Sequence, residues 1–388
     1  MPLLVRSSAG WQRRGGWVYG VRDVNMEVAV YAGQGAPIDA ILAFFDQLEY
    51  VPAQHDPRWA YVFSRLKGED FYVAVASEDG EILGTANCTV FQGPLGAIAH
   101  ANPFMGYGGC SCVSGREEEV IPALMRSMAD HARAMGCVTM SVAIPPFHER
   151  VTALYVLSLE PEYCFSNFFQ YNDLDRHPLD CMNSTARHRI VNRLRRTISL
   201  GVTVRLAETA EEVEAWLDIY KDRYTQIGVR PLPRQFLMES WRSFAPLRKA
   251  ELFLAYQQAQ MLGGGLFVRG RGIVDYFSCA YNDEGMELNA NVPVIDAAVK
   301  YYMGLGIRRL NWQSSPSRES GVYAFKKRWG AIEGEYMILT KVLADPEILT
   351  RRPLAEVRDA YCHHFVLPYV LWDGQQACKG ELKPRLAV

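Results

Sequence analysis

The sequence has few of the features that stabilise a secreted protein or attract a charged partner. Its 388 residues contain nine cysteines, an odd number with no regular spacing. A disulfide framework requires paired cysteines, so this pattern predicts reduced thiols and a cytoplasmic protein. The formal net charge is only −2. That balance excludes a global field that draws in nucleic acid or an anionic membrane, and leaves such attraction to local basic clusters.

Long apolar runs, nucleotide-binding loops and metal-ligand patterns are also missing. The N-terminal stretch MPLLVRSSAGWQRRGGW has no apolar run long enough for a signal peptide or a membrane helix. Gly263-Gly264-Gly265 lacks the Lys-Ser/Thr of a P-loop, so a bulge or close packing is expected there. Cys110 and Cys112 have no second Cys/His pair at ligand spacing. We expect no stable membrane insertion, no metal and no resident cofactor.

The chain does contain enough apolar material for two domains. Hydrophobic residues make up 49% and charged residues 22% of the sequence, which is a globular composition. At 388 residues the chain is longer than one ordinary domain and fits two.

An internal similarity supports this division. FYVAVASEDGEILGTANCTV (71–90) has the pattern of strand, turn and strand, with Asp79-Gly80 as the turn. About 180 residues later, ELFLAYQQAQMLGGGLFV (251–268) repeats it, and Leu262-Gly263 matches Leu83-Gly84. Each hairpin is followed by a helical pattern, a glycine and a strand: 116–145 after the first, 292–313 after the second. Two copies of one αβ unit, each with a mixed sheet flanked by helices, account for this repetition.

Boundaries follow from the segment between the copies. The basic helical stretch ARHRIVNRLRRTISLG (186–201) is preceded by DCMNST, whose polar side chains can cap a helix. We therefore predict domains at 1–183 and 184–345. Residues 346–388 are expected to be a C-terminal amphipathic helix or extended tail, with a poorly ordered end.

The sharpest local pattern is NWQSSPSRESGVYAFKKRWGAIEGEYMIL (311–339). It resembles the G…FK..(W/F)G signature of the FemAB-like acyltransferases, which are tandem GNAT-fold proteins. RLRRTISLGVTV (193–204) resembles the family's basic helix leading into its second domain, and residues 57–84 resemble its tryptophan-then-hairpin opening. NPFMGYGG (102–109) resembles the loop of the family's non-peptidoglycan branch. The resemblance covers roughly residues 50–340 and implies an α/β fold of two tandem GNAT-like domains.

The implied activity is transfer of an acyl or aminoacyl group to an amine, which forms an amide. Such a reaction needs a cation or N–H donors near the developing oxyanion. The resemblance places Lys326 beside the acyl carbonyl as the catalytic cation, with Phe325 next to the substrate. The alternative is that Lys326, Lys327 and Arg328 form the solvated face of a short helix; we assign only Lys326 to catalysis, a role that needs no unusual pKa.

Two further regions are candidates for substrate binding. The loop Tyr107-Gly108-Gly109 brings backbone amides near a ligand if its glycines allow close approach, or it is only a tight turn. The familiar cell-wall branch has an arginine-containing loop here, so a UDP-muramyl peptide acceptor is not favoured. The basic helix can receive a phosphate or can be a solvated face. Among its arginines, Arg196 best matches the family's position.

The central strands of the second domain supply the remaining candidates. IVDYFSCAY (273–281) and MELNANVP (286–293), both expected to be strands, contribute Tyr276 as a hydrogen-bond donor or proton relay and Asn291 as an acceptor-orienting group. A strand tyrosine is also a common packing residue. Ser315 and Arg318, in the loop before the FK helix, are expected to line the same pocket.

The donor is either aminoacyl-tRNA or an acyl thioester carried by CoA or a carrier protein. Neither domain has the R/Q-x-x-G-x-G/A loop with which GNAT proteins bind CoA, which favours aminoacyl-tRNA. The acceptor is expected to be the amine of a small metabolite or an envelope precursor. A catalytically inactive GNAT-like binding module is the non-enzymatic alternative.

Overall fold

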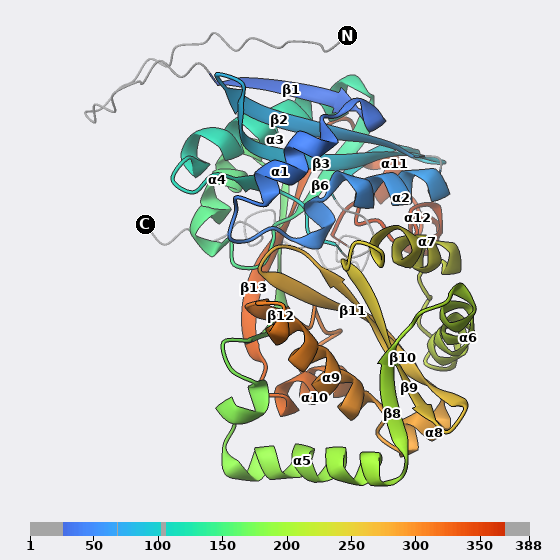
Figure 1. The fold of residues 1–388 in the computed structure, drawn as a ribbon. Helices are drawn as coiled ribbons and strands as arrows, with labels where there is room; N and C mark the ends of the chain where they lie inside the picture. Colours follow the sequence, from blue (N-terminus) through green and yellow to red (C-terminus); the bar gives the residue numbers. More distant parts are fainter. Residues whose placement is uncertain (1–25, 68, 102–105, 369–388) are drawn as a thin grey trace. The chain divides into compact units, whose positions relative to one another are not determined.

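The computed structural model describes residues 26–67, 69–101 and 106–368 (Figure 1). They form two compact units, each assembled from separate stretches of the chain. Unit 1 takes the residues up to Leu48, Lys67–Phe165 and those from Met337 onwards; unit 2 takes Glu49–Leu66 and Ser166–Tyr336. Within the described ranges, no helix is both long and apolar enough to cross a membrane.

Unit 1 is a mixed sheet with helices packed on it. Its strand order is β1 (Glu27–Ala32), β2 (Asp70–Glu78), β3 (Glu81–Gly93), β4 (Gly96–Ala101), β6 (Cys137–Ala143) and β13 (Ile332–Val342), with β5 (Cys110–Cys112) paired to β3. Only β4 and β6 are parallel. A parallel pair needs a crossover, and the chain between them contains helix α3 (Glu117–Ala134). The smaller helices are α1 (Ile38–Phe45) and α4 (Thr152–Leu159).

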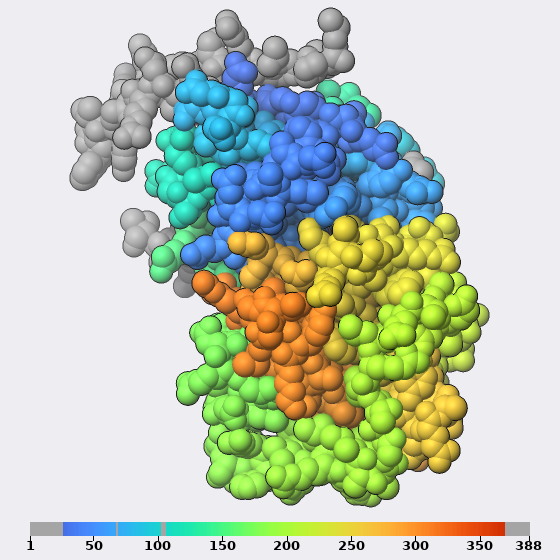
Figure 2. Space-filling view, in the orientation of Figure 1, coloured from blue at the N-terminus to red at the C-terminus, as the bar shows by residue number. Residues whose placement is uncertain are grey.

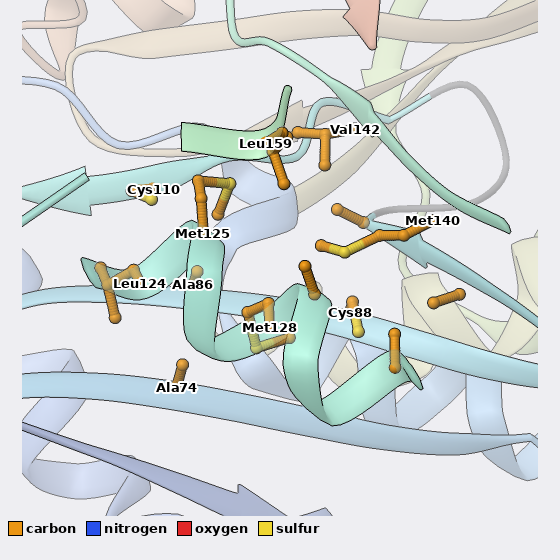
Figure 3. Close-up of a cluster of buried hydrophobic side chains, with 14 of the residues drawn as sticks. Ala74, Ala86, Cys88, Cys110, Leu124, Met125, Met128, Met140, Val142 and Leu159 are labelled. Carbon is orange, nitrogen blue, oxygen red and sulfur yellow. The ribbon is translucent and has the colours of Figure 1, made fainter. Parts of the chain in front are cut away.

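The core of unit 1 lies between α3 and the sheet. Leu124, Met125 and Met128 of α3 are almost fully buried, at 0–1% exposure, and lie over Ala74 and Ala86 of the sheet (Figure 3). Alanines at these strand positions let the helix approach closely while its larger side chains fill the space. The helical spacing predicted for residues 116–136 is thereby confirmed.

Unit 2 repeats this arrangement. Its strand order is β13, β7 (Tyr163–Asp173), β12 (Arg309–Asn311), β11 (Ile273–Tyr281), β10 (Gln260–Arg269), β9 (Ala250–Gln257) and β8 (Val202–Leu206). Again one pair, β11 with β12, is parallel, and the crossover contains α8 (Asp283–Glu287) and α9 (Asn291–Gly304). The other helices are α2 (Pro57–Lys67), α5 (Ser184–Ser199), α6 (Ala210–Gln226), α7 (Arg234–Phe244) and α10 (Gly321–Arg328).

The two hairpins have the same irregularity in their strand register. In β2–β3, Ile82 pairs with Ser77 and Gly84 with Ala76, so the register skips Leu83. In β9–β10, Met261 pairs with Tyr256 and Gly263 with Ala255, so it skips Leu262. Equivalent bulges confirm the match of Leu83-Gly84 with Leu262-Gly263 and explain the glycine run in β10.

The turn of the first hairpin is also as predicted. Asp79 and Gly80 both have positive φ, 51° and 86°. Two consecutive positive φ values are the requirement of a type I′ turn, which Asp-Gly meets at low steric cost.

The units divide the chain differently from the contiguous domains predicted from sequence. β7 follows the first copy in sequence but pairs with β12 of the second, while β13 follows the second copy and its residues from Ile338 onwards pair with β6 of the first. Each copy thus donates its last strand to the other unit. Strand pairing depends on partners distant in sequence, which boundary signals near residues 183 and 345 do not report.

The C-terminal segment returns to unit 1. It contains α11 (Glu347–Thr350) and α12 (Leu354–Ala360). Leu349, Val357 and Tyr361 pack with Leu95 and Ile98 of the first copy. Residues 369–388, where a poorly ordered end is predicted, lie outside the described residues.

One predicted strand is wrong. MELNANVP (286–293) forms the end of α8, a turn and the start of α9, not a central strand. The Asn282 side chain caps α8 by accepting from the Gly285 amide at 2.8 Å, and Asn289 has a positive φ of 55°. Pro293 lies in the first turn of α9, where its missing N–H costs nothing, whereas a central strand excludes proline.

Candidate active site

The site is built where β12 ends. After Asn311 the chain passes through Trp312 into Gln313, whose φ of 62° turns the backbone sharply. The loop then leads to α10, which begins at Gly321 and is capped by the Ser320 hydroxyl, 3.2 Å from the Tyr323 amide. A polar residue before a short helix fixes its first turn, so the cap positions the residues that follow.

Lys326 of α10 points back into this turn. Its ammonium nitrogen donates to the carbonyl oxygens of Gln313 at 3.0 Å and Ser314 at 2.7 Å, and the residue is only 5% exposed. Among the described residues no carboxylate forms an ion pair with it. Burial lowers the pKa of Lys326 to about 8, and the nearby Cys279 thiol opposes this only in part.

This geometry leaves one position on the lysine nitrogen open. A protonated lysine has three N–H donors, and two of them are engaged by carbonyls. The third can donate to an oxyanion. With a pKa of about 8, roughly nine tenths of the lysine is protonated at pH 7.

A buried carboxylate is connected to this turn by hydrogen bonds. Asp275 of β11 is 2% exposed and accepts from Gln54 Nε2 at 2.9 Å and from Asn311 Nδ2 at 2.8 Å. Asn311 in turn accepts from the Gln313 amide at 3.0 Å. Burial raises the pKa of Asp275 to about 6, while these hydrogen bonds favour its ionised form. A hydrogen-bonded chain thus runs from Asp275 to the Gln313 backbone that holds Lys326.

Polar side chains of β7 hold the loop and α10 from the other side. Gln170 accepts from Ser315 Oγ at 3.1 Å. Asn172 accepts from Trp312 Nε1 at 2.6 Å and donates to the Trp329 carbonyl at 3.2 Å. These bonds fix both ends of the segment from 312 to 329. Gln170 and Asn172 were not predicted from the sequence. Two amide side chains on one face of an aromatic strand are nevertheless a pattern that could have indicated a polar site.

Ser315 and Arg318, predicted to line the pocket, are already engaged. Ser315 is buried on Gln170. The Arg318 guanidinium donates to Glu333 at 2.8 Å and lies 4.6 Å from the centre of the Phe168 ring. Both residues shape the loop through these contacts.

Tyr276 lies inside an aromatic cluster. Its ring stacks on Phe267 at 4.8 Å and meets Trp312 edge-on at 5.6 Å, and the residue is 9% exposed. Burial raises the pKa of Tyr276 well above its usual range. The phenol therefore stays neutral and can donate a hydrogen bond. Phe325 is half-buried against the same Trp312 at 6.2 Å.

The Tyr107-Gly108-Gly109 loop belongs to unit 1 and precedes β5. The Gly108 amide donates to the Ala143 carbonyl at 2.7 Å, and the amide of Cys110, two residues on, donates to the Tyr155 hydroxyl at 3.0 Å. A Cβ at Gly108 would lie 2.5 Å from the Ala101 carbonyl oxygen. The glycine thus meets a packing requirement inside the unit, and these two amides have protein partners.

The basic helix α5 divides into two faces. Arg189 and Arg193 line a cavity of about 400 Å³ that Phe325, Lys327 and Arg328 of α10 line from the opposite side. Arg196 is exposed and is not part of the cavity lining, and neither is Asn291. In the space-filling view α5 lies at the surface of unit 2, along the lower edge of the picture (Figure 2). Lys327 and Arg328 are exposed, as expected, but they face this cavity.

Comparison with known proteins agrees with this fold. Residues 184–327 match the model of a family described as an acetyltransferase (GNAT) domain. This part of the chain is therefore similar to GNAT domains. The match includes α5, the sheet of the second copy and Lys326. No curated protein matches the chain closely enough to count as a relative.

Solved structures resemble the chain over most of its length. A crystal structure of FemX superposes with a TM-score of 0.62 at 16% identity, covering 79% of this chain and 96% of FemX. The C-terminal domain of a putative lysylphosphatidylglycerol synthetase from Agrobacterium fabrum gives 0.52 at 11% identity, with 78% and 90% covered. A protein of unknown function from Bacteroides thetaiotaomicron gives 0.53 at 11%, with 78% and 96% covered. The predicted α/β fold of two tandem GNAT-like domains is confirmed.

Proposed function

We propose that the protein is an N-acyltransferase that moves an aminoacyl group from aminoacyl-tRNA to the amine of a small metabolite or envelope precursor. The observation that carries the proposal is the buried Lys326, held by two carbonyls with one N–H left over. It lies within the segment that matches the GNAT family. A fixed ammonium there is suited to the oxyanion of acyl transfer.

The reaction balances without a cofactor. The amine nitrogen attacks the ester carbonyl carbon, the new C–N bond forms, and the carbonyl oxygen becomes an oxyanion that accepts from Lys326. Collapse of this intermediate breaks the C–O bond to the donor. The amine loses one proton and the leaving hydroxyl gains one, so no net proton is consumed.

The choice of an aminoacyl donor has two supports. The sequence lacks the glycine-containing loop with which GNAT proteins hold CoA pyrophosphate. One structure of like fold is named as a domain of a putative lysylphosphatidylglycerol synthetase, a name that denotes an aminoacylated product. An acyl thioester is the competing donor.

A transfer assay with the purified full chain tests the proposal. Charged tRNA and acyl-CoA are offered in parallel with a panel of amine acceptors, and amide products are measured by mass spectrometry. We expect product only with charged tRNA, and its loss after ribonuclease treatment. Product formed from acyl-CoA that resists ribonuclease would overturn the aminoacyl assignment.

The catalytic assignment is tested by Lys326→Ala. Removing one oxyanion donor costs about 10²–10³ in kcat in a serine protease, and we expect a loss of that order. Lys221→Ala, which removes an exposed lysine of α6, is the matched control and is expected to keep wild-type turnover. A Lys326→Ala enzyme with full turnover contradicts the assignment. Wild type that forms no product with either donor supports the inactive binding module instead.

A further inference from the structure

The cavity between α5 and α10 carries positive charge and no negative charge. Arg189 and Arg193 lie one helical turn apart on α5, so their side chains share a face. Lys327 and Arg328 lie in the last turn of α10. All four line the same cavity of about 400 Å³, and no aspartate or glutamate lines it.

Two basic residues near the cavity have carboxylate partners. Arg187, on the other face of α5, pairs with Asp180 at 3.0 Å, and Arg318 pairs with Glu333 at 2.8 Å. In the part of the chain that the structure describes, none of the four cavity cations forms an ion pair with a carboxylate. Like charges gathered around one space repel each other, and a bound anion relieves this repulsion.

Two of these cations contact aromatic rings, and the charge of Lys327 also helps to lower the pKa of Glu333. The Arg328 guanidinium lies 5.7 Å from the centre of the Phe325 ring, and the Lys327 nitrogen lies 6.0 Å from that of Tyr323. Phe325, Ile190 and Val292 give the cavity an apolar lining beside its charges. Cations next to an aromatic surface are the combination that single-stranded nucleic acid uses, with phosphates on the cations and bases on the rings.

The position of the cavity relative to Lys326 further limits the chemical class of the ligand. Phe325 and Lys327 flank Lys326 on one short helix, with Lys326 directed to the β12 turn and its two neighbours lining the cavity. A donor that carries an acyl ester at one end, followed directly by phosphodiester groups, can contact both faces of α10. Its ester then lies near Lys326 and its phosphates lie in the cavity.

We infer that the α5–α10 cavity, defined by Arg189, Arg193, Lys327 and Arg328, binds the phosphodiester backbone at the single-stranded 3′ end of the donor RNA. The inference rests on the proposed function, because it identifies where the donor is held. It assigns the phosphate contacts to Arg189 and Arg193 in place of the exposed Arg196. The cations at the end of α10 also complement the helix dipole, and that role alone predicts no ligand.

Binding of an uncharged RNA tests the site without requiring transfer. The probe is a fluorescently labelled RNA hairpin with a single-stranded 3′ CCA end, titrated with the full chain at several salt concentrations. Arg193→Glu is compared with Arg195→Glu, which reverses the same charge two residues away on a side chain that does not line the cavity. Thermal unfolding followed by circular dichroism confirms that both variants fold.

We expect Arg193→Glu to weaken RNA binding by at least about tenfold and to reduce the salt slope by about one or more, while Arg195→Glu changes affinity by less than about threefold. Lys327→Glu, on the opposite wall, should behave as Arg193→Glu does. Equal losses in the Arg193 and Arg195 variants would overturn the inference, because they indicate only a surface field. Unchanged binding in Arg193→Glu would overturn it as well.

Two competitors identify the source of the phosphate. Inorganic phosphate at millimolar concentration is expected to displace the RNA weakly, as a fragment of its backbone. Coenzyme A that displaces the RNA where inorganic phosphate has no effect would assign the cavity to a thioester donor and overturn the RNA assignment. Wild type that binds RNA through the cavity but fails to transfer from charged tRNA would contradict the proposed function alone.

Discussion

Lys326 is buried without a counter-ion, and its two carbonyl partners compensate for only part of its lost hydration. Taking an ammonium out of water disfavours the charged form, which is why its pKa falls to about 8 instead of remaining near the usual value for lysine. Perturbed lysines of this kind concentrate at functional sites. The charge that catalysis needs is therefore mostly present at pH 7 and is lost as pH rises through about 8.

This environment predicts a pH dependence for transfer. If the ammonium is the active form, the protonated fraction and hence kcat fall as pH rises through about 8. Lys326→Arg keeps its charge to above pH 12, so its rate, reduced by the larger side chain, should show no fall between pH 8 and 10. The measurement is kcat against pH for both proteins with a saturating acceptor.

The acceptor amine must lose a proton in both the wild-type and the Lys326→Arg reactions. The kcat of both proteins should therefore rise together with increasing pH in the lower pH range. A falling limb that persists unchanged in Lys326→Arg would assign it to another group. A wild-type rate that rises steadily through pH 8 would show that neutral Lys326 acts as a base.

The turn beneath Lys326 depends on a second perturbed group. Burial raises the pKa of Asp275 to about 6. Between about pH 4 and pH 6 the folded protein therefore holds a proton at Asp275 that the unfolded chain has released. The stability that this carboxyl contributes is present below pH 4 and is lost as pH rises through about 6. At neutral pH the charged form persists because Gln54 and Asn311 both donate to it.

At the scale of elements, α10 is a short helix whose position depends on its ends. Its eight residues are too few to form a stable helix alone. The Ser320 cap fixes its start, and the hydrogen bond from Asn172 to the Trp329 carbonyl fixes its end. A small displacement of either end moves Lys326 relative to the two carbonyls.

Loss of this cap should therefore reduce activity as well as stability. Ser320→Ala is expected to destabilise the protein by about 1 kcal/mol and to lower kcat several-fold. Thr209→Ala removes the equivalent cap of α6, where Thr209 accepts from the Glu212 amide, and should lose similar stability without losing kcat. Chemical denaturation and steady-state kinetics of the two variants give the comparison; parallel losses of kcat would contradict a positioning role for the α10 cap.

At the scale of the whole molecule, neither sequence copy contains a complete unit. Unit 2 requires β7 from the end of the first copy and α2 from near its start. Trp59 of α2 is 2% exposed and lies against Phe236 at 5.5 Å and Phe277 at 5.4 Å. Removing such a buried tryptophan from a core costs several kcal/mol.

A fragment cut at the linear boundaries should consequently fail to fold. Residues 184–345 expressed alone lack β7 and α2, so we expect no cooperative thermal transition and poor dispersion of amide resonances. The full chain measured under the same conditions is the control. A fragment that melts cooperatively near the temperature of the full chain would show that the exchanged strand and helix are dispensable.

The local sequence was sufficient for the elements that depend on neighbouring residues. Hydrophobic alternation and Asp79-Gly80 predicted the first hairpin, and helical spacing predicted α3. The FK segment predicted a short helix carrying Lys326, which is present. The strict alternation of apolar and polar residues in MELNANVP has the period of a strand, but in the fold this segment joins the end of α8 to the start of α9.

The tertiary structure decided what depends on distant residues. It brought Gln54, Asp275 and Asn311 together, lowered the pKa of Lys326 by burial, and exchanged β7 and β13 between the copies. It also divided the arginines of α5 into a face that lines a cavity and a face that meets solvent. The sequence by itself determined a duplicated α/β GNAT fold with one candidate lysine, because those patterns are local. Desolvation, strand pairing and charge clustering arise only between residues that folding brings together.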